Sequence, residues 1–311
     1  MKYIFVLSLL VISLKSFAQF GYGKVEDIQD IKKRTLIILL EEEDEKILKK
    51  LAKKPDELKF YKEEIVRLNA DLTEMATKFW TFTSAPITKT RTEVEALKAS
   101  KDKKYAVLAF DRYKATDWAR DFYGANRYAI NSKLIGALFI DLIEEFEERK
   151  SISVQNLPNL VPTKGDLAAG FEMMQNYLNA RLAGKKRKDT MDEVKENGAQ
   201  LKSKTLLLDK EDLKGKLKPA DIKAAYPYTY KIVSYAEIEK AILEKDSQYA
   251  FVQIVPLSLG TLSFEHIVLD AGTGKALSQY LPIQVTTIGN SSNTNERIGE
   301  KALKAYVKNA D

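Results

Sequence analysis

One stretch of the chain occurs twice, and this repeat constrains the fold more than any other feature. Residues 90–95 lead on to residues 101–108, and residues 234–239 lead on to residues 245–252. The offset is constant, because 234 − 90, 245 − 101 and 249 − 105 all give 144. Each copy predicts a helix start, a short helix, a charged turn and a buried strand. The repeat therefore predicts two related modules of α/β structure.

The residues common to both copies are those that start a helix or form a buried strand. Thr90 and Ser234 each stand three residues before a glutamate, Glu93 or Glu237, which is the capping-box spacing at a helix start. After the turn, residues 105–110 and 249–255 are almost continuously apolar. Runs of this kind are typical of strands that are covered on both faces in a parallel sheet.

The residues before each copy extend the pattern to β-α-β-α-β. In the first half we expect a strand over 35–40, a helix over 41–75 broken near Pro55, and a strand over 79–84. In the second half the order repeats, with a strand over 205–208, a helix over 211–225 and a strand over 226–233. Such alternation favours mostly parallel sheets with right-handed crossovers.

A helical hairpin is expected between the two modules. Residues 131–149 carry a wide apolar face at helical spacing, and residues 166–183 form a second amphipathic pattern that ends at Gly184. A hairpin of strands (264–269 and 275–277) and a final helix (295–308) follow the second copy. The predicted domains are residues 1–18 as a signal peptide, 19–130 as the first module, 131–200 as the hairpin and a basic linker, and 201–311 as the second module.

The amino-terminal residues predict export. A lysine at position 2 precedes the apolar run 4–14, and Ser16 and Ala18 are the small residues that a signal peptidase reads. We expect cleavage after Ala18 and a secreted or periplasmic protein. The ending Phe17-Ala18-Gln19 resembles signal peptides common in Bacteroidetes. No cysteine follows the apolar run, so a lipoprotein anchor is not expected, and no later apolar segment is long enough to predict an integral membrane protein.

Composition narrows the chemistry. The chain has 0 cysteines, which excludes thiol catalysis and thiolate metal sites. The net charge of +6 becomes 6 − 2 = +4 once Lys2 and Lys15 are removed, and this mild, lysine-rich excess does not favour nucleic-acid binding. One basic run could contact an anionic polymer or membrane surface, or could be a solvated linker: Lys185, Lys186, Arg187 and Lys188.

His266 and Asp270 are the candidate catalytic residues. His266 is the only histidine, and Asp270 could orient it, but no serine nucleophile elbow accompanies them.

The run 270–275 has two glycines and a lysine, yet its spacing fails the phosphate-loop pattern and it lies between two strands, so a turn is the better interpretation. No cofactor is expected.

Carboxylates follow the first strand of each module. Glu41 and Asp44, and in the second module Asp209 and Asp212, could hold Mg²⁺ or Ca²⁺ at the carboxyl ends of parallel strands. The same residues also suit a helix start.

Aromatic residues supply the candidate ligand-binding positions. Tyr226, Tyr228 and Tyr230 alternate along an expected strand, and Trp118 stands in a second aromatic group. Exposed, such rings could stack on sugars or bases, whereas half-buried rings would be ordinary packing.

The layout resembles the small β-α-β-α-β modules of periplasmic envelope proteins, namely the amino-terminal domain of the Tol-Pal translocation protein and the curli secretion lipoprotein. The resemblance covers topology alone. It implies a role in envelope assembly or protein interaction, with an envelope protein or a cell-wall glycan as partner.

Two hypotheses follow for function. The first is an exported, non-catalytic binding or envelope-assembly protein. The alternative is a hydrolase or a small-ligand or metal-binding enzyme, with its site near His266 and Asp270 or at the acidic strand ends.

Overall fold

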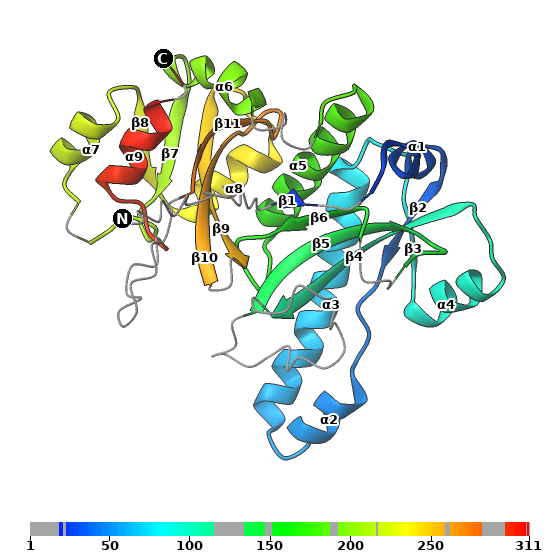
Figure 1. Cartoon of the computed structure of the whole chain (residues 1–311). Helices are drawn as coiled ribbons and strands as arrows, with labels where there is room; N and C mark the ends of the chain where they lie inside the picture. Colours follow the sequence, from blue (N-terminus) through cyan, green and yellow to red (C-terminus); the bar gives the residue numbers. More distant parts are fainter. Residues whose placement is uncertain are drawn as a thin grey trace, which may run out of the picture.

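The structure is a computed structural model that describes residues 19–20, 23–114, 134–146, 151–186, 192–215, 217–258, 262–281, 296–308 and 310. Within these residues the chain forms two mixed β-sheets, with helices between the sheets and on their outer faces (Figure 1). The α/β class is therefore confirmed. The prediction of mostly parallel sheets is wrong, because antiparallel strands complete each sheet.

The first sheet has the strand order β1-β6-β5-β4-β2-β3. Its strands are β1 (Gln19–Phe20), β2 (Thr35–Leu39), β3 (Ile87–Lys89), β4 (Tyr105–Lys114), β5 (Leu134–Leu142) and β6 (Ser153–Asn156). Strand β2 is parallel to β3 and β4, and the other pairs are antiparallel. The accompanying helices are α1 (Val25–Lys33), α2 (Glu45–Leu51), α3 (Pro55–Phe79), α4 (Arg91–Ala99) and α5 (Lys164–Leu182).

The second sheet has the order β11-β10-β9-β7-β8. Its strands are β7 (Thr205–Asp209), β8 (Tyr230–Val233), β9 (Tyr249–Ser258), β10 (Leu262–Asp270) and β11 (Ala276–Tyr280). Here β7 is parallel to β8 and β9, while β10 is antiparallel to β9 and β11. The helices of this half are α6 (Asp192–Gly198), the short 3-10 helix η2 (Ala199–Lys202), α7 (Pro219–Ala225), α8 (Tyr235–Leu243) and α9 (Glu300–Val307).

The two sheets follow the same plan. Strands β2 to β6 correspond one by one to β7 to β11, in the same spatial order and with the same parallel and antiparallel pairs. The repeated residues occupy matching places: Tyr105 begins β4 opposite Thr35, and Tyr249 begins β9 opposite Thr205. The preceding turns match as well, since Lys101 and Lys245 both have positive φ angles, 56° and 52°.

An ion pair recurs at the same place in each sheet. Arg34, just before β2, binds Glu144 in the turn after β5 with an N–O distance of 2.6 Å. Lys204, just before β7, binds Asp270 at the end of β10 at 3.0 Å. Each pair ties the start of a central parallel strand to the far end of an antiparallel hairpin strand. The pair in the second sheet is the more deeply buried, with side chains 11% and 5% exposed.

One hydrophobic core joins the two sheets. It contains residues of β2, β4 and β5 from the first sheet, residues of β7, β9 and β10 from the second, and the inner sides of α3, α5 and α8. Helix α5 is the centre of this layer, because it packs on α3, α8, α1 and β6. Figure 1 shows α5 and α8 between the two sheets. The halves therefore share their interior.

The halves meet through unlike faces. In the first half α3 lies on the shared core and α4 lies outside, where Val94 packs in a separate cluster. In the second half the matching helices exchange places: α8 buries Ile238 in the shared core, and α7 buries Ile222 in an outer cluster with α9.

The predicted helical hairpin is wrong in its first helix. Residues 131–149 were expected to be helical, but Leu134–Leu142 form β5, in which every residue is buried. The apolar spacing that suits one face of a helix also suits a strand covered on both faces, and β5 has apolar clusters on both sides. The second helix is confirmed as α5, which ends before Gly184 with φ of 87°.

Other element boundaries also differ from expectation. The break near Pro55 is confirmed, since α2 ends at Leu51 and α3 begins at Pro55. The strand expected over 79–84 is absent, because α3 continues to Phe79 and the edge strand is β3 instead. The strand expected over 226–233 is limited to β8, and the helix expected over 211–225 is limited to α7. The hairpin of β10 and β11 is confirmed.

Gly274 supports a close approach between α5 and the β10–β11 turn. Its φ is 62°, and a Cβ atom there would collide with the Cβ of Glu172 on α5. We expect Gly274→Ala to lower the free energy of unfolding by roughly 2–4 kcal/mol, from left-handed backbone and overpacking together. Gly184→Ala is the control, because its φ is 87° but nothing lies within 4 Å of the added atom. Urea unfolding measures both variants, and equal losses would contradict a steric role for Gly274.

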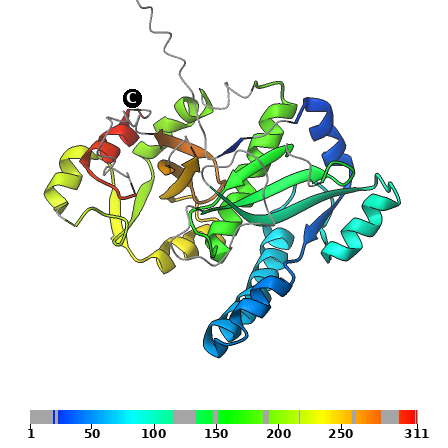
Figure 2. The ribbon, with the colours of Figure 1, turned by 60° about the horizontal axis from the view of Figure 1, so that its bottom comes forward.

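Helix α3 is unusually long for this fold, and part of it stands away from the body. It has 25 residues, whereas its counterpart α7 has 7. Helix α2 packs against its first turns through Leu51, Tyr61 and Ile65, and the two project from the molecule as an arm (Figure 2). Among the described residues no helix is both long enough and apolar enough to cross a membrane.

Candidate functional site

An open groove runs along the second half of α3. Its volume is about 620 Å³. The residues that line it come from one stripe of α3, from the end of β2 and from β3: Leu40, Asn69, Ala70, Thr73, Glu74, Thr77, Lys78 and Thr88. The groove is open to solvent, so it could hold a ligand against the surface but would not enclose it. We call this feature the α3 groove.

The side chains of Thr73, Thr77 and Ala70 give the α3 groove hydrogen-bond acceptors and methyl groups. The hydroxyls of Thr73 and Thr77 donate to helix carbonyls four residues earlier, both at 2.7 Å, so their lone pairs remain for a ligand. Asn69 is fixed against the chain after β2, because its amide donates to the carbonyl of Glu41 and accepts from the N–H of the same residue. The groove therefore has a rigid wall that can accept hydrogen bonds.

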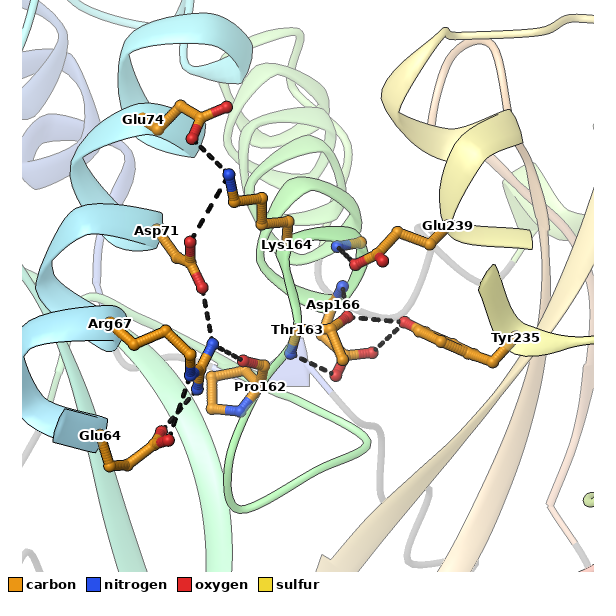
Figure 3. Close-up of polar contacts among 11 residues, drawn as sticks. Glu64, Arg67, Asp71, Glu74, Pro162, Thr163, Lys164, Asp166, Tyr235 and Glu239 are labelled. Atoms are coloured by element: carbon orange, nitrogen blue, oxygen red, sulfur yellow. Dashed lines mark hydrogen bonds and ion pairs between the residues drawn. The ribbon is translucent and has the colours of Figure 1, made fainter. Parts of the chain in front are cut away.

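A network of charged side chains lies beside the groove and joins α3 to the start of α5 (Figure 3). Arg67 binds Glu64 and Asp71 on its own helix and donates to the carbonyl of Pro162 at 3.2 Å. The hydrogen bond with Glu64 is the main cause of a raised Arg67 pKa. Arg67 thus holds the loop before α5 against α3.

Lys164 connects this network to the groove wall. Its Nζ donates to Glu74 at 2.6 Å and lies 3.7 Å from Asp71. The hydrogen bond to Glu74 raises the pKa of Lys164. Glu74 therefore has one side in the groove and the other in the network, which fixes its position (Figure 3).

Asp166 continues the network into the second half of the molecule. It is fully buried and accepts hydrogen bonds from Asn159 (2.9 Å), from the N–H of Thr163 (3.0 Å) and from the hydroxyl of Tyr235 (2.8 Å). Tyr235 begins α8, so this carboxylate links the two halves (Figure 3). Burial raises the pKa of Asp166 and also the pKa of Tyr235.

The raised pKa of Asp166 gives a pH prediction. The folded protein holds this proton more tightly than the unfolded chain, so the carboxyl lowers stability as the pH rises above about 4. Asp166→Asn should remove this loss, so that its stability relative to the parent increases from pH 4 to pH 7. Asp166→Ala should lose roughly 1–3 kcal/mol at both pH values, because its three donors are left without an acceptor. Urea unfolding at the two pH values is the measurement, and a pH-independent difference for the asparagine variant would contradict the assignment.

The structure places His266 and Asp270 in different surroundings. His266 is fully buried, its Nδ1 lies 2.6 Å from the hydroxyl of Tyr306, and its ring meets Tyr280 edge-on. Asp270 binds Lys204 and accepts from the N–H of Gly272 at 2.8 Å. The two side chains are therefore not brought together, and each has a partner that explains its position.

The acidic candidates follow β2 and β7 as expected, but in separate halves. Asp44 caps α2 by accepting from two backbone N–H groups, and Asp209 accepts from the N–H of Glu211. Burial and the charge of Asp209 raise the pKa of Asp212 to about 6. Within the part of the chain that the structure describes, no group of three or more acidic or histidine side chains could hold a metal ion.

The tyrosine candidates are packed together rather than exposed as a ladder. Tyr226 is fully buried and meets Tyr228 edge-on at 5.4 Å, and both precede β8. The hydroxyl of Tyr230 donates to the carbonyl of Pro219. Trp118 lies outside the described residues, as do Arg187 and Lys188 of the basic run. Lys185 and Lys186 follow α5, and Lys185 is 3.4 Å from Glu196.

Sequence reasoning missed the α3 groove. A signal was present, because Val66, Ala70, Thr73 and Thr77 recur at helical spacing on a side of α3 that carries no large apolar core residue. Of these, Val66 is 70% exposed. The position of β3 beside this stripe could not be read from the sequence.

Comparison with known proteins adds no assignment: no family model, curated protein or solved structure matches the chain.

Proposed function

We propose that this chain is an exported, non-catalytic binding protein of the bacterial envelope, built from two duplicated modules, and that its ligand occupies the α3 groove. The α3 groove is the observation that carries this proposal. It is open to solvent, and hydrogen bonds fix the positions of several side chains that line it.

Three matched features support the duplication. They are the common strand plan, the positive φ angles at Lys101 and Lys245, and the recurring ion pairs Arg34–Glu144 and Lys204–Asp270. The ion pairs involve residues that the sequence repeat did not include, so they support duplication independently of it.

Export and envelope function are proposals that rest on the sequence. The predicted signal peptide, residues 1–18, lies outside the described residues. The proposed resemblance to Tol-Pal and curli modules concerns the β-α-β-α-β portion of each half, and it favours an envelope protein or a cell-wall glycan as partner.

The enzyme alternative has one observation in its favour, the pKa of about 6 for Asp212, which is suited to acid–base chemistry near neutral pH. A general base must reach the proton that it removes, and His266 is fully buried. Binding is therefore the function that the geometry supports best.

A thermal-shift screen tests the proposal. The probes are peptidoglycan fragments, oligosaccharides, peptides, nucleotides and divalent metals, each added to the mature protein. A ligand at 100 times its Kd should raise stability by about 2.7 kcal/mol. For a chain of this size that is a rise of roughly 4–5 °C in Tm.

Two tryptophan variants locate the binding. Ala70→Trp fills the groove from an exposed position, and Lys59→Trp places the same side chain on α3 outside the groove. We expect the shift to disappear in Ala70→Trp and to persist in Lys59→Trp. A ligand that shifts all three proteins equally would contradict the groove assignment.

A further inference from the structure

The edge strand β3 offers an unused hydrogen-bonding position. Among the described residues, β3 is the last strand of the first sheet and pairs only with β2, in parallel. The carbonyl of Lys89 accepts from the N–H of Leu40 at 2.9 Å, so it points toward β2. Because backbone groups alternate sides along a strand, the N–H and C=O of Thr88 point away from the sheet. Thr88 is exposed, and Ile87 beside it is 37% exposed.

The α3 groove lies directly over this edge. Thr88 forms one side of the groove, and Ala70, Thr73 and Thr77 of α3 form the other. The helix layer therefore extends past the last strand of the sheet. A further strand added at the usual spacing of about 4.8 Å from β3 would lie under α3, with alternate side chains directed at its threonine methyl groups.

As far as the structure describes it, the second half of the molecule has no counterpart to the long helix beside its edge strand. Its edge strand β8 is the counterpart of β3, but the helix α7 has 7 residues against 25 in α3. Ile232 of β8 takes the place of Thr88, as both lie opposite the matching residues of β7 and β2. The long helix and the polar edge residue thus occur together where the groove is found.

We propose that β3 and the α3 groove bind an extended polypeptide segment of a partner protein by strand addition. This inference rests on the proposed function and names its ligand class. A glycan is disfavoured because no aromatic side chain lines the groove for sugar stacking. A second copy of the chain is disfavoured as well, since a strand of 3 residues falls far short of the roughly 800 Å² per partner that a stable interface buries.

The groove also indicates which segments fit. Side chains that point toward α3 meet Ala70, the methyl groups of Thr73 and Thr77, and Leu40. Valine, isoleucine and threonine suit these contacts and also favour extended backbone. The charges in the groove are partly balanced, because Glu74 is bound by Lys164 and Lys78 also lines the groove, so a segment with uncharged polar or amide side chains fits best.

A proline substitution tests strand addition directly. Thr88→Pro removes the outward N–H, and proline is tolerated on edge strands where that group faces solvent. Thr88→Val changes the side chain and keeps the N–H. Peptides selected from a displayed library of random 12-residue sequences would be measured by calorimetry on the parent, both Thr88 variants and Ala70→Trp, after thermal unfolding has shown that every variant folds.

We expect peptides that bind the parent to lose at least tenfold in affinity on Thr88→Pro, to stay within about threefold on Thr88→Val, and to fail on Ala70→Trp. Hydrogen exchange of the Thr88 amide should slow when peptide is bound. Equal binding to the two Thr88 variants would overturn strand addition while leaving the groove as a binding site. Selection of no peptide, with an oligosaccharide binding in a groove-dependent way, would overturn the inference and keep the proposed function. Failure of every probe would remove both.

Discussion

Replacing Asp270 by alanine is expected to lower the free energy of unfolding by about 3–5 kcal/mol, because it leaves the buried ammonium of Lys204 without its counter-charge. The side chains of this pair are only 5% and 11% exposed, and their atoms are 3.0 Å apart. Asp270 also accepts from the N–H of Gly272 in the turn that follows β10. Its loss therefore removes a charge partner and a turn contact together.

The matching pair in the first sheet is the control. Glu144 binds Arg34 through both oxygens, but Arg34 also lies 3.9 Å from Asp30 and donates to the carbonyl of Tyr105, so Glu144→Ala leaves it with a counter-charge and should cost only about 1–2 kcal/mol. Arg34 also lowers the pKa of Glu144, so its contribution should be present above about pH 4.5 and should fade as the pH falls below that value. Urea unfolding of the two variants at pH 7 compares them. Equal losses would contradict the role assigned to the remaining partners of Arg34, and no loss for Asp270→Ala would contradict the structural role of the Lys204–Asp270 pair.

Phe171→Ala is expected to lower stability by about 3–5 kcal/mol, which is typical of a large cavity in a core. Phe171 is fully buried on α5 and meets the ring of Trp80 edge-on at 6.2 Å. Because the core is shared, the variant should unfold in one transition at a lower temperature rather than in two. Amide hydrogen exchange on β4 and β9 reports the two sheets separately and should show the same loss of protection in both.

Phe60→Ala serves as the control for this substitution, since the ring of Phe60 on α3 is 60% exposed and its removal should be nearly neutral. If Phe171→Ala weakened protection on β4 alone, the halves would be independent and the shared core would not govern their stability.

The sequence predicted the parts of the fold that depend on local chemistry. The capping spacing at Thr90 and Ser234 and the turns at Lys101 and Lys245 all mark real helix starts and strand starts. The run Leu134–Leu142 was misread, since an apolar segment buried on both sides has no periodicity that separates helix from strand. What identifies this run as a strand is its pairing with β4 along its whole length. Such pairing cannot be deduced from the sequence of one segment.

The candidate site was harder to predict than the fold. His266 and Asp270 drew attention by residue type, but their burial and partners depend on tertiary contacts with Tyr306 and Lys204. The α3 groove is formed by threonines and an alanine, which have no distinctive chemistry by themselves. It lies where α3 passes the edge strand β3, and that neighbourhood appears only once the strands are ordered.

Because the two halves meet through unlike faces, helices at matching positions have different surroundings, and this affects how similar their sequences can be. Helices α8 and α3 need apolar side chains that enter the shared core. Their counterparts, α4 and α7, instead pack in smaller clusters outside that core. Matching helices of the two halves therefore need different surface residues, which is why their sequences need not resemble each other. The residues at caps and tight corners have the same surroundings in both halves, and these are the residues that recur in the sequence.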